Sequence, residues 1–131
     1  MFKYAVEYED YNEEIVKEDL YFHLSEIDLI EMEASQDGGF EDYIQKIIDT
    51  KDLKSLIGIF KELILKSYGI KDEKGKFHKS AAITEDFASS AAYPEFFSKL
   101  ATDDKLASEF VMGIIPKKIR DSISDKIPDK N

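Results

Sequence analysis

The sequence contains no cysteine, only two histidines and no long apolar run. The absence of cysteine excludes disulfides, thiolate zinc sites and cysteine nucleophiles, and it fits a reducing cytosol. No apolar run approaches the roughly 18 residues that a membrane span requires. The N-terminal stretch MFKYAVEYEDY becomes acidic where a secretory signal would stay apolar. These features predict a soluble cytoplasmic protein that makes no contact with a membrane.

Residues suited to catalysis or metal binding are also scarce. His23 and His78 offer no ligand spacing such as HExxH. The acid pairs Glu13–Glu14 and Asp103–Asp104 are placed at a turn and at a helix start, where carboxylates are usually solvated or capping. The phosphate-binding and nucleophile motifs GxGxxG, GxxxxGK[ST] and GxSxG are missing. The sequence therefore predicts a non-enzymatic protein without a cofactor or a metal.

The net charge of -10 is distributed unevenly. Residues 1–50 hold 15 acids and 3 lysines, residues 51–116 hold 10 charges of each sign, and residues 117–131 hold 5 bases and 3 acids. An acidic N-terminal part repels phosphate backbones, so nucleic-acid binding is disfavoured. Two interpretations of these acids are left open. They form either a solvated face that keeps the protein soluble or a surface that docks a basic partner.

The first 23 residues have the pattern of a β-hairpin. Phe2, Tyr4, Val6 and Tyr8 alternate with polar or small residues, as in a half-buried strand. The polar segment 9–14 is expected to turn the chain, and the apolar residues after it to return the chain in a second strand. Because a lone hairpin is marginally stable in water, its apolar face must pack on the helices that follow.

Helical periodicity dominates the next fifty residues. Ser25, with Asp28 three residues later, predicts the N-cap of a short helix that ends before the glycines at 38 and 39. Its apolar side is expected to consist of Ile27, Leu29, Ile30 and Met32. A second helix is expected over residues 40–49. A third, capped by Thr50, should end near Tyr68–Gly69, with the glycine in the left-handed conformation. The composition of residues 72–75 then predicts a turn.

Three short helical units are expected between residues 80 and 113, with Phe96 on the apolar face of the second and Phe110 on that of the third. Thr84 or Ser80 begins the first unit, and Pro94 fits the first position of the second. The third unit begins at residues 102–104 and ends at Gly113, after which residues 114–116 are expected to be extended.

Together these patterns predict an α+β fold that is mostly helical, with an N-terminal β-hairpin. Residues 1–116 are predicted to form a single globular domain, with the hairpin at about 2–23 and the helices at about 25–112. Residues 117–131 carry only a thin apolar stripe. They are predicted to be a flexible tail or a segment that folds on a partner.

Three segments of the chain are similar to segments of one phage protein family. YGIK at 68–71, followed by GKFHKS at 75–80, resembles the YG(V/I)K…GRRFIKS passage of the tail assembly chaperones of long, non-contractile-tailed phages of Gram-positive hosts. Residues 83–116 resemble the family's stretch ending in LATD…FxxGIxP, and residues 18–48 resemble its hairpin-and-helix entry. Phe77–His78 and Tyr93–Pro94 depart from the family's usual residues. The likeness extends over most of residues 2–116, and the tail shows none.

The resemblance implies a non-enzymatic chaperone in the host cytoplasm, absent from the mature virion. Such a chaperone binds the tape-measure protein and keeps it soluble during tail assembly. The tail tube protein is a further candidate partner, and self-association and a longer frameshifted form are left open. The candidate partner-binding residues are Phe96, Phe97, Phe110 and Ile114, and their alternative role is core packing. A structural adaptor of the virion and an acidic mimic of DNA remain as alternative functions.

Overall fold

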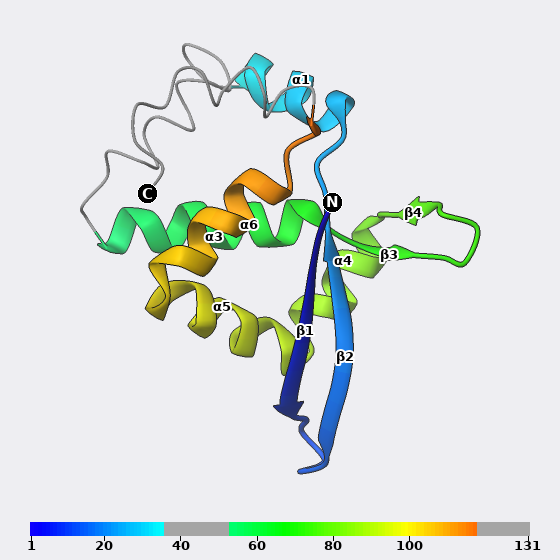
Figure 1. Cartoon of the computed structure of the whole chain (residues 1–131), viewed down its shortest axis with the longest axis vertical. Helices are drawn as coiled ribbons and strands as arrows, with labels where there is room; N and C mark the ends of the chain where they lie inside the picture. The colour runs from blue at the N-terminus through cyan, green and yellow to red at the C-terminus, as the bar shows by residue number, and fades with distance from the viewer. Residues whose placement is uncertain (36–52, 118–131) are drawn as a thin grey trace.

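A computed structural model of the chain describes residues 1–35 and 53–117 (Figure 1). In this part of the chain, four strands form one sheet in the order β1-β2-β3-β4, and each neighbouring pair is antiparallel. The strands are β1 (Phe2–Glu9), β2 (Ile15–Phe22), β3 (Tyr68–Lys71) and β4 (Phe77–His78). The helices are α1 (Glu26–Ser35), α3 (Leu53–Ser67), α4 (Ala81–Ala88), α5 (Ala92–Thr102) and α6 (Asp104–Gly113). The predicted α+β fold with an N-terminal hairpin is confirmed.

Some predictions fall on residues that the structure does not describe. These are the helix over 40–49, the helix break at Gly38–Gly39, the cap at Thr50 and, beyond Lys117, the C-terminal tail. They stay predictions.

The β1–β2 hairpin has the side-chain alternation that its sequence predicts. Val6 in β1 and Leu20 and Phe22 in β2 are buried beneath the helices. Lys3, Ala5 and Glu7 lie on the opposite side of β1 and are exposed. The two strands pair over their whole length, from Phe2 opposite Phe22 to Glu9 opposite Ile15. The hairpin extends beyond α5, so that its turn and α1 lie at opposite ends of the molecule (Figure 1).

A second hairpin, formed by β3 and β4, was not predicted. α3 ends at Ser67 as expected, but Gly69 is not left-handed. It lies in β3 and pairs with Tyr21. A Cβ atom at Gly69 would lie 2.6 Å from the ring of Phe77 and 2.8 Å from the carbonyl oxygen of His78. Glycine is therefore needed for the close approach of β3 to β4, and not to end the helix.

The turn between β3 and β4 is the one predicted from composition. Asp72 accepts hydrogen bonds through its carboxylate from the backbone of Lys74 (2.9 Å) and Lys76 (2.8 Å). Gly75 adopts a φ of 85°, which a residue without a Cβ takes at little cost. The two strands were missed because four and two residues are too few to show alternation.

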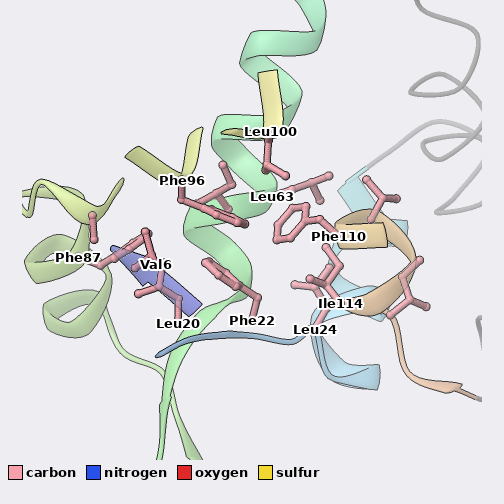
Figure 2. Close-up of a cluster of buried hydrophobic side chains, with 14 of the residues drawn as sticks. Val6, Leu20, Phe22, Leu24, Leu63, Phe87, Phe96, Leu100, Phe110 and Ile114 are labelled. Carbon is pink, nitrogen blue, oxygen red and sulfur yellow. The ribbon is translucent and has the colours of Figure 1, made fainter. Parts of the chain in front are cut away.

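Phe22 occupies the centre of the hydrophobic core (Figure 2). Its ring stacks on Phe96 of α5 with centroids 4.7 Å apart, and it meets Phe110 of α6 edge-on at 5.4 Å. Each such pair contributes about 0.5–1.5 kcal/mol beyond the burial of its area. Leu63 and Ile64 of α3 are also fully buried in this cluster. The core thus joins the hairpin to helices from the C-terminal half, as the marginal stability of a lone hairpin requires.

The starts and ends of the last three helices refine the predictions. Ser80, and not Thr84, caps α4, and its hydroxyl accepts a hydrogen bond from the Ile83 N–H at 3.1 Å. α5 begins at Ala92, so Pro94 is its third residue and not its first. Proline is tolerated there because N–H groups of the first turn have no partner within the helix.

α6 begins and ends as predicted, but the chain after it differs. Asp103 caps the helix, with its carboxylate accepting from the Leu106 N–H at 3.0 Å. Ile114 is not extended, since its φ of -79° and ψ of -13° continue the helical turn. This conformation places Ile114 and Ile115 in the core, and the Ile114 carbonyl accepts a hydrogen bond from the Leu24 N–H at 2.7 Å.

Candidate functional site

Three of the four candidate partner-binding residues lie inside the hydrophobic core. The exposed fraction is 0% for Phe96 and Phe110 and 1% for Ile114, and Figure 2 shows these side chains turned toward one another. A side chain without exposed area contacts a partner only if the core opens. The structure therefore favours the alternative role for these three residues, which is core packing. The fourth candidate, Phe97 of α5, is only partly buried against the core and stays a candidate contact.

The exposed apolar side chains gather in the acidic N-terminal part. Among the described residues, five of the six large exposed hydrophobic side chains belong to residues 1–35. That segment holds 11 acids and only two lysines. The exposed fractions of the six apolar side chains are Met1 46%, Tyr11 75%, Ile15 63%, Ile27 70%, Ile30 63% and, outside the segment, Ile70 49%. The acids and the apolar surface of the described residues thus occur together.

Two of these exposed side chains lie on the outer face of one helix, α1. Ile27 and Ile30 are three residues apart, so they lie side by side on the helix surface. Leu29 points the other way and is only 6% exposed, since it packs into the core. All three were predicted to lie on the apolar side of this helix. Periodicity could have separated them, because Leu29 lies about 200° around the helix from Ile27.

A set of polar contacts holds the start of α1 in place. The Ser25 hydroxyl accepts from the Asp28 N–H at 3.1 Å, and the Asp28 carboxylate accepts from the Ser25 N–H at 2.8 Å. This reciprocal pair is the predicted capping box, with aspartate in the place of the usual glutamate. The Lys79 Nζ donates to Asp28 Oδ2 at 2.6 Å and to the carbonyl oxygens of His23 and Lys66, both at 3.1 Å. One ammonium group therefore ties α1 to the ends of β2 and α3.

The charge state of Asp28 follows from these contacts. Partial burial raises the pKa of Asp28, but hydrogen bonds from Lys79 and from Ser25 outweigh that effect and hold the pKa below its usual value. The carboxylate is consequently ionised at neutral pH, which is the state that Lys79 binds.

The turn of the β1–β2 hairpin is ordered by its own polar groups. The carboxylate of Asp10 accepts from the N–H groups of Asn12 (2.8 Å) and Glu14 (3.0 Å), and Glu13 adopts a φ of 63°. In the strands above the turn, the Tyr8 hydroxyl donates to Glu18 at 2.6 Å. Burial, together with that hydrogen bond, raises the pKa of Tyr8 to about 12. These contacts leave Tyr11 projecting from an ordered acidic turn.

Two shallow hollows lie on the surface of the described residues. The first is lined by Ala5, Val6, Glu7, Lys17, Glu18 and Asp19, and the second by Asp28, Leu65, Lys66, Lys79, Ser80 and Thr84. No three His, Asp or Glu side chains of the described part converge on a metal position. The His78 Nε2 lies 2.9 Å from Asp72, and the hydrogen bond from this imidazole holds the pKa of that exposed carboxyl below its usual value.

Comparison with known proteins gives one match. None of the described helices is long and apolar enough to cross a membrane. No curated protein and no solved structure matches the chain. The family model for phage tail assembly chaperones matches residues 1–130, and so extends through the tail, where the sequence analysis found no likeness. Because the match covers nearly every residue, the chain belongs to the phage tail assembly chaperone family.

Proposed function

We propose that the protein binds the tape-measure protein of its phage and keeps it soluble while the tail assembles. Membership of the tail assembly chaperone family supports a role in tail assembly that is not enzymatic. The observation that carries the finer proposal is the exposed pair Ile27 and Ile30 on α1. These side chains offer apolar surface that a partner can cover, on an element that the core holds only through its inner face.

The chemistry of α1 suits an amphipathic helix as the bound segment. Two isoleucines three residues apart fit between the apolar anchors of a partner helix, which recur at i, i+3, i+4 and i+7. Four acids and no base lie within α1 itself, at positions 26, 28, 31 and 33. Basic residues beside the partner's anchors would meet this negative charge, which speeds association and discriminates against acidic helices. The proposed ligand is therefore a basic amphipathic helix of the tape-measure protein.

Solubility of such a complex follows from the distribution of charge. A partner helix that binds α1 covers its own apolar face, and the acids of residues 1–35 outside the contact keep the surface of the complex charged. Phe97, partly exposed on α5, is a second candidate contact. In this proposal the protein acts in the host cytoplasm before the tail tube forms, and it does not remain in the virion.

Co-expression with the tape-measure protein tests the proposal. The tape-measure protein should be insoluble when expressed alone and should be recovered as a soluble complex with the wild-type chain. The double variant Ile27→Ser with Ile30→Ser should lose most of the soluble complex, because it removes the apolar contact without disturbing the core. Ile70→Ser is the matched control, since Ile70 is also an exposed isoleucine but lies on β3. This control should bind as the wild type does.

Three results would contradict the proposal. If the tape-measure protein is equally soluble with and without this chain, the chaperone activity is refuted. If the chain is found in purified phage particles, the structural adaptor of the virion becomes the better explanation. Equal loss of binding in the α1 variant and in the Ile70→Ser control would place the contact elsewhere.

A further inference from the structure

β1 is an edge strand that the described residues leave open on one side. It pairs with β2 through one edge, and no strand of the described part pairs with the other. It is eight residues long and contains no proline and no glycine. Native edge strands are usually short, bulged or interrupted, because an open edge offers hydrogen-bonding groups to any other strand. The length and regularity of β1 therefore call for an explanation.

The turn shows which backbone groups of β1 face the open side. The Asp10 N–H donates to the Glu14 carbonyl at 2.9 Å, so residues 10 and 14 form a hydrogen-bonded pair. Hydrogen-bonded and non-hydrogen-bonded pairs alternate along an antiparallel ladder. The even-numbered residues of β1 therefore bond to β2, whereas Lys3, Ala5 and Glu7 direct their N–H and C=O groups outward. No backbone hydrogen bond to these outward groups occurs among the described residues.

The sequence of β1 is complementary to itself about Ala5. If a second copy approaches antiparallel with Ala5 opposite Ala5, Lys3 lies opposite Glu7 on each side of the axis. On the other face of the sheet, Phe2 then lies opposite Tyr8 and Tyr4 opposite Val6. We propose that the protein forms a twofold dimer in which β1 pairs with β1 of a second copy in this register, making one continuous sheet of eight strands.

The backbone supplies the main attraction in this dimer. The pairs Lys3–Glu7, Ala5–Ala5 and Glu7–Lys3 are all of the hydrogen-bonded kind, which gives about six bonds between the two copies. They satisfy outward groups that are otherwise left to water. Any register shifted by one residue is disfavoured, because it would oppose the core-facing side chains of one copy to the solvent-facing side chains of the other.

The side chains of β1 favour a second copy of this chain, and not an unrelated strand, as the partner at the open edge. Lys3 and Glu7 now make exposed ion pairs within the chain, with Asp19 and Lys17, both at 3.6 Å. Exposed pairs of this kind are weak and rearrange easily. In the dimer, Lys3 would lie between Asp19 of its own chain and Glu7 of the second copy, so both carboxylates neutralise it. Phe2, Tyr4 and Tyr8 are only partly buried. They would gain cross-strand neighbours on the core side.

Charge reversal tests the register. In sedimentation equilibrium at physiological salt, the wild-type protein should have a molar mass twice the 15.1 kDa of one chain. Lys3→Glu and Glu7→Lys should each raise the dimer dissociation constant about tenfold or more, since each places two like-charged pairs directly opposite. The double variant Lys3→Glu with Glu7→Lys should restore dimerisation, because it exchanges the charges across the axis. It does not restore the ion pairs with Asp19 and Lys17, so recovery would report the contact between copies.

Two substitutions of Ala5 test the dimer without changing any charge. Ala5→Pro removes an outward N–H that β2 does not use, and proline is tolerated on edge strands, so this variant should be a folded monomer. Ala5→Cys introduces the only thiol of the chain. Directly opposed residues of a hydrogen-bonded pair have Cα atoms about 5.5 Å apart, within the range that a disulfide bridges. Mild oxidation should therefore yield a covalent dimer.

Asp19→Cys is the matched control for the cysteine variant. Asp19 lies directly beside Ala5 on the same exposed face, but it is in β2, one strand away from the open edge. It should cross-link much more slowly than Ala5→Cys. A wild-type chain that stays monomeric at high concentration would overturn the proposal. A dimer that survives Ala5→Pro, or equal cross-linking of the two cysteine variants, would do the same. None of these measurements needs the tape-measure protein, so the outcome is separate from that of the proposed function.

Discussion

The two described parts of the chain use their apolar residues in opposite ways. Residues 53–117 carry balanced charge, and their aromatic side chains Phe87, Phe96 and Phe110 are almost completely buried. Residues 1–35 are strongly acidic, and they bury one side of each element while leaving isoleucines and a tyrosine in water. Residues 53–117 thus supply most of the buried core, packed around Phe22 of β2, and the acidic segment offers most of the exposed apolar surface. Local density of aromatic residues alone does not identify a binding site.

The largest test of this comparison is truncation of one side chain from each part. Phe96→Ala should lower the free energy of unfolding by about 3–5 kcal/mol, because it leaves a cavity beside Phe22 and Phe110. Ile27→Ser should change it by less than about 0.5 kcal/mol, since Ile27 is 70% exposed. Urea denaturation followed by circular dichroism measures both values. Equal destabilisation by the two variants would refute the division into core and surface.

A smaller effect is expected at the junction of the two parts, where β3 joins β2. Gly69→Ala should destabilise the protein by about 1–3 kcal/mol, because the new methyl group would lie 2.8 Å from the His78 backbone oxygen. Gly75→Ala provides a contrasting control: its Cβ meets no atom within 4 Å, so any loss there comes from the φ of 85° alone. Thermal unfolding of both variants makes the comparison. A neutral Gly69→Ala would show that β4 is not packed against β3 as described.

The junction also explains which parts of the fold could be predicted. The β1–β2 hairpin and the end of α3 were predictable because their patterns extend over eight or more residues. The β3–β4 hairpin was missed, since its strands are short and Gly69 was interpreted as a helix-ending residue. Its role depends on Phe77 and His78, which only the folded chain brings close. Local signals therefore predicted elements, but not the contacts between them.

The candidate site shows the same limit. Periodicity identified Phe96 and Phe110 correctly as members of apolar helix faces, but it could not say whether those faces meet the core or a partner. Burial decides that question, and it depends on the position of Phe22, which is far away in the sequence. Ile27 and Ile30 were assigned to the buried side together with Leu29, although the helical period places Leu29 about 200° around the helix from Ile27. A short helix with Leu29 between them has no clear single apolar face.

The smallest expected effect concerns the attachment of α1 to the rest of the molecule. Folding lowers the pKa of Asp28, so its ion pair with Lys79 stabilises the folded state fully above the unfolded pKa of about 4. This contribution is lost as pH falls through the folded pKa. Asp28→Asn should therefore be less stable than the wild type at pH 7, by about 1 kcal/mol or less because solvent reaches the pair. The difference should shrink as the pH falls below the unfolded pKa of about 4 and vanish below the lowered folded pKa.

Urea denaturation of both chains at pH 7, 5 and 3 measures this difference. Other carboxyl groups titrate over the same range, and Asp72 has a lowered pKa of its own. Their effects are common to the two chains and cancel when the stabilities are subtracted. A difference that stays constant from pH 7 to pH 3 would mean that Asp28 acts only by capping α1, since an asparagine cap does not titrate. A difference that vanishes on acidification would show that the charge of Asp28 holds α1, with its exposed isoleucines, against residues 53–117 through Lys79.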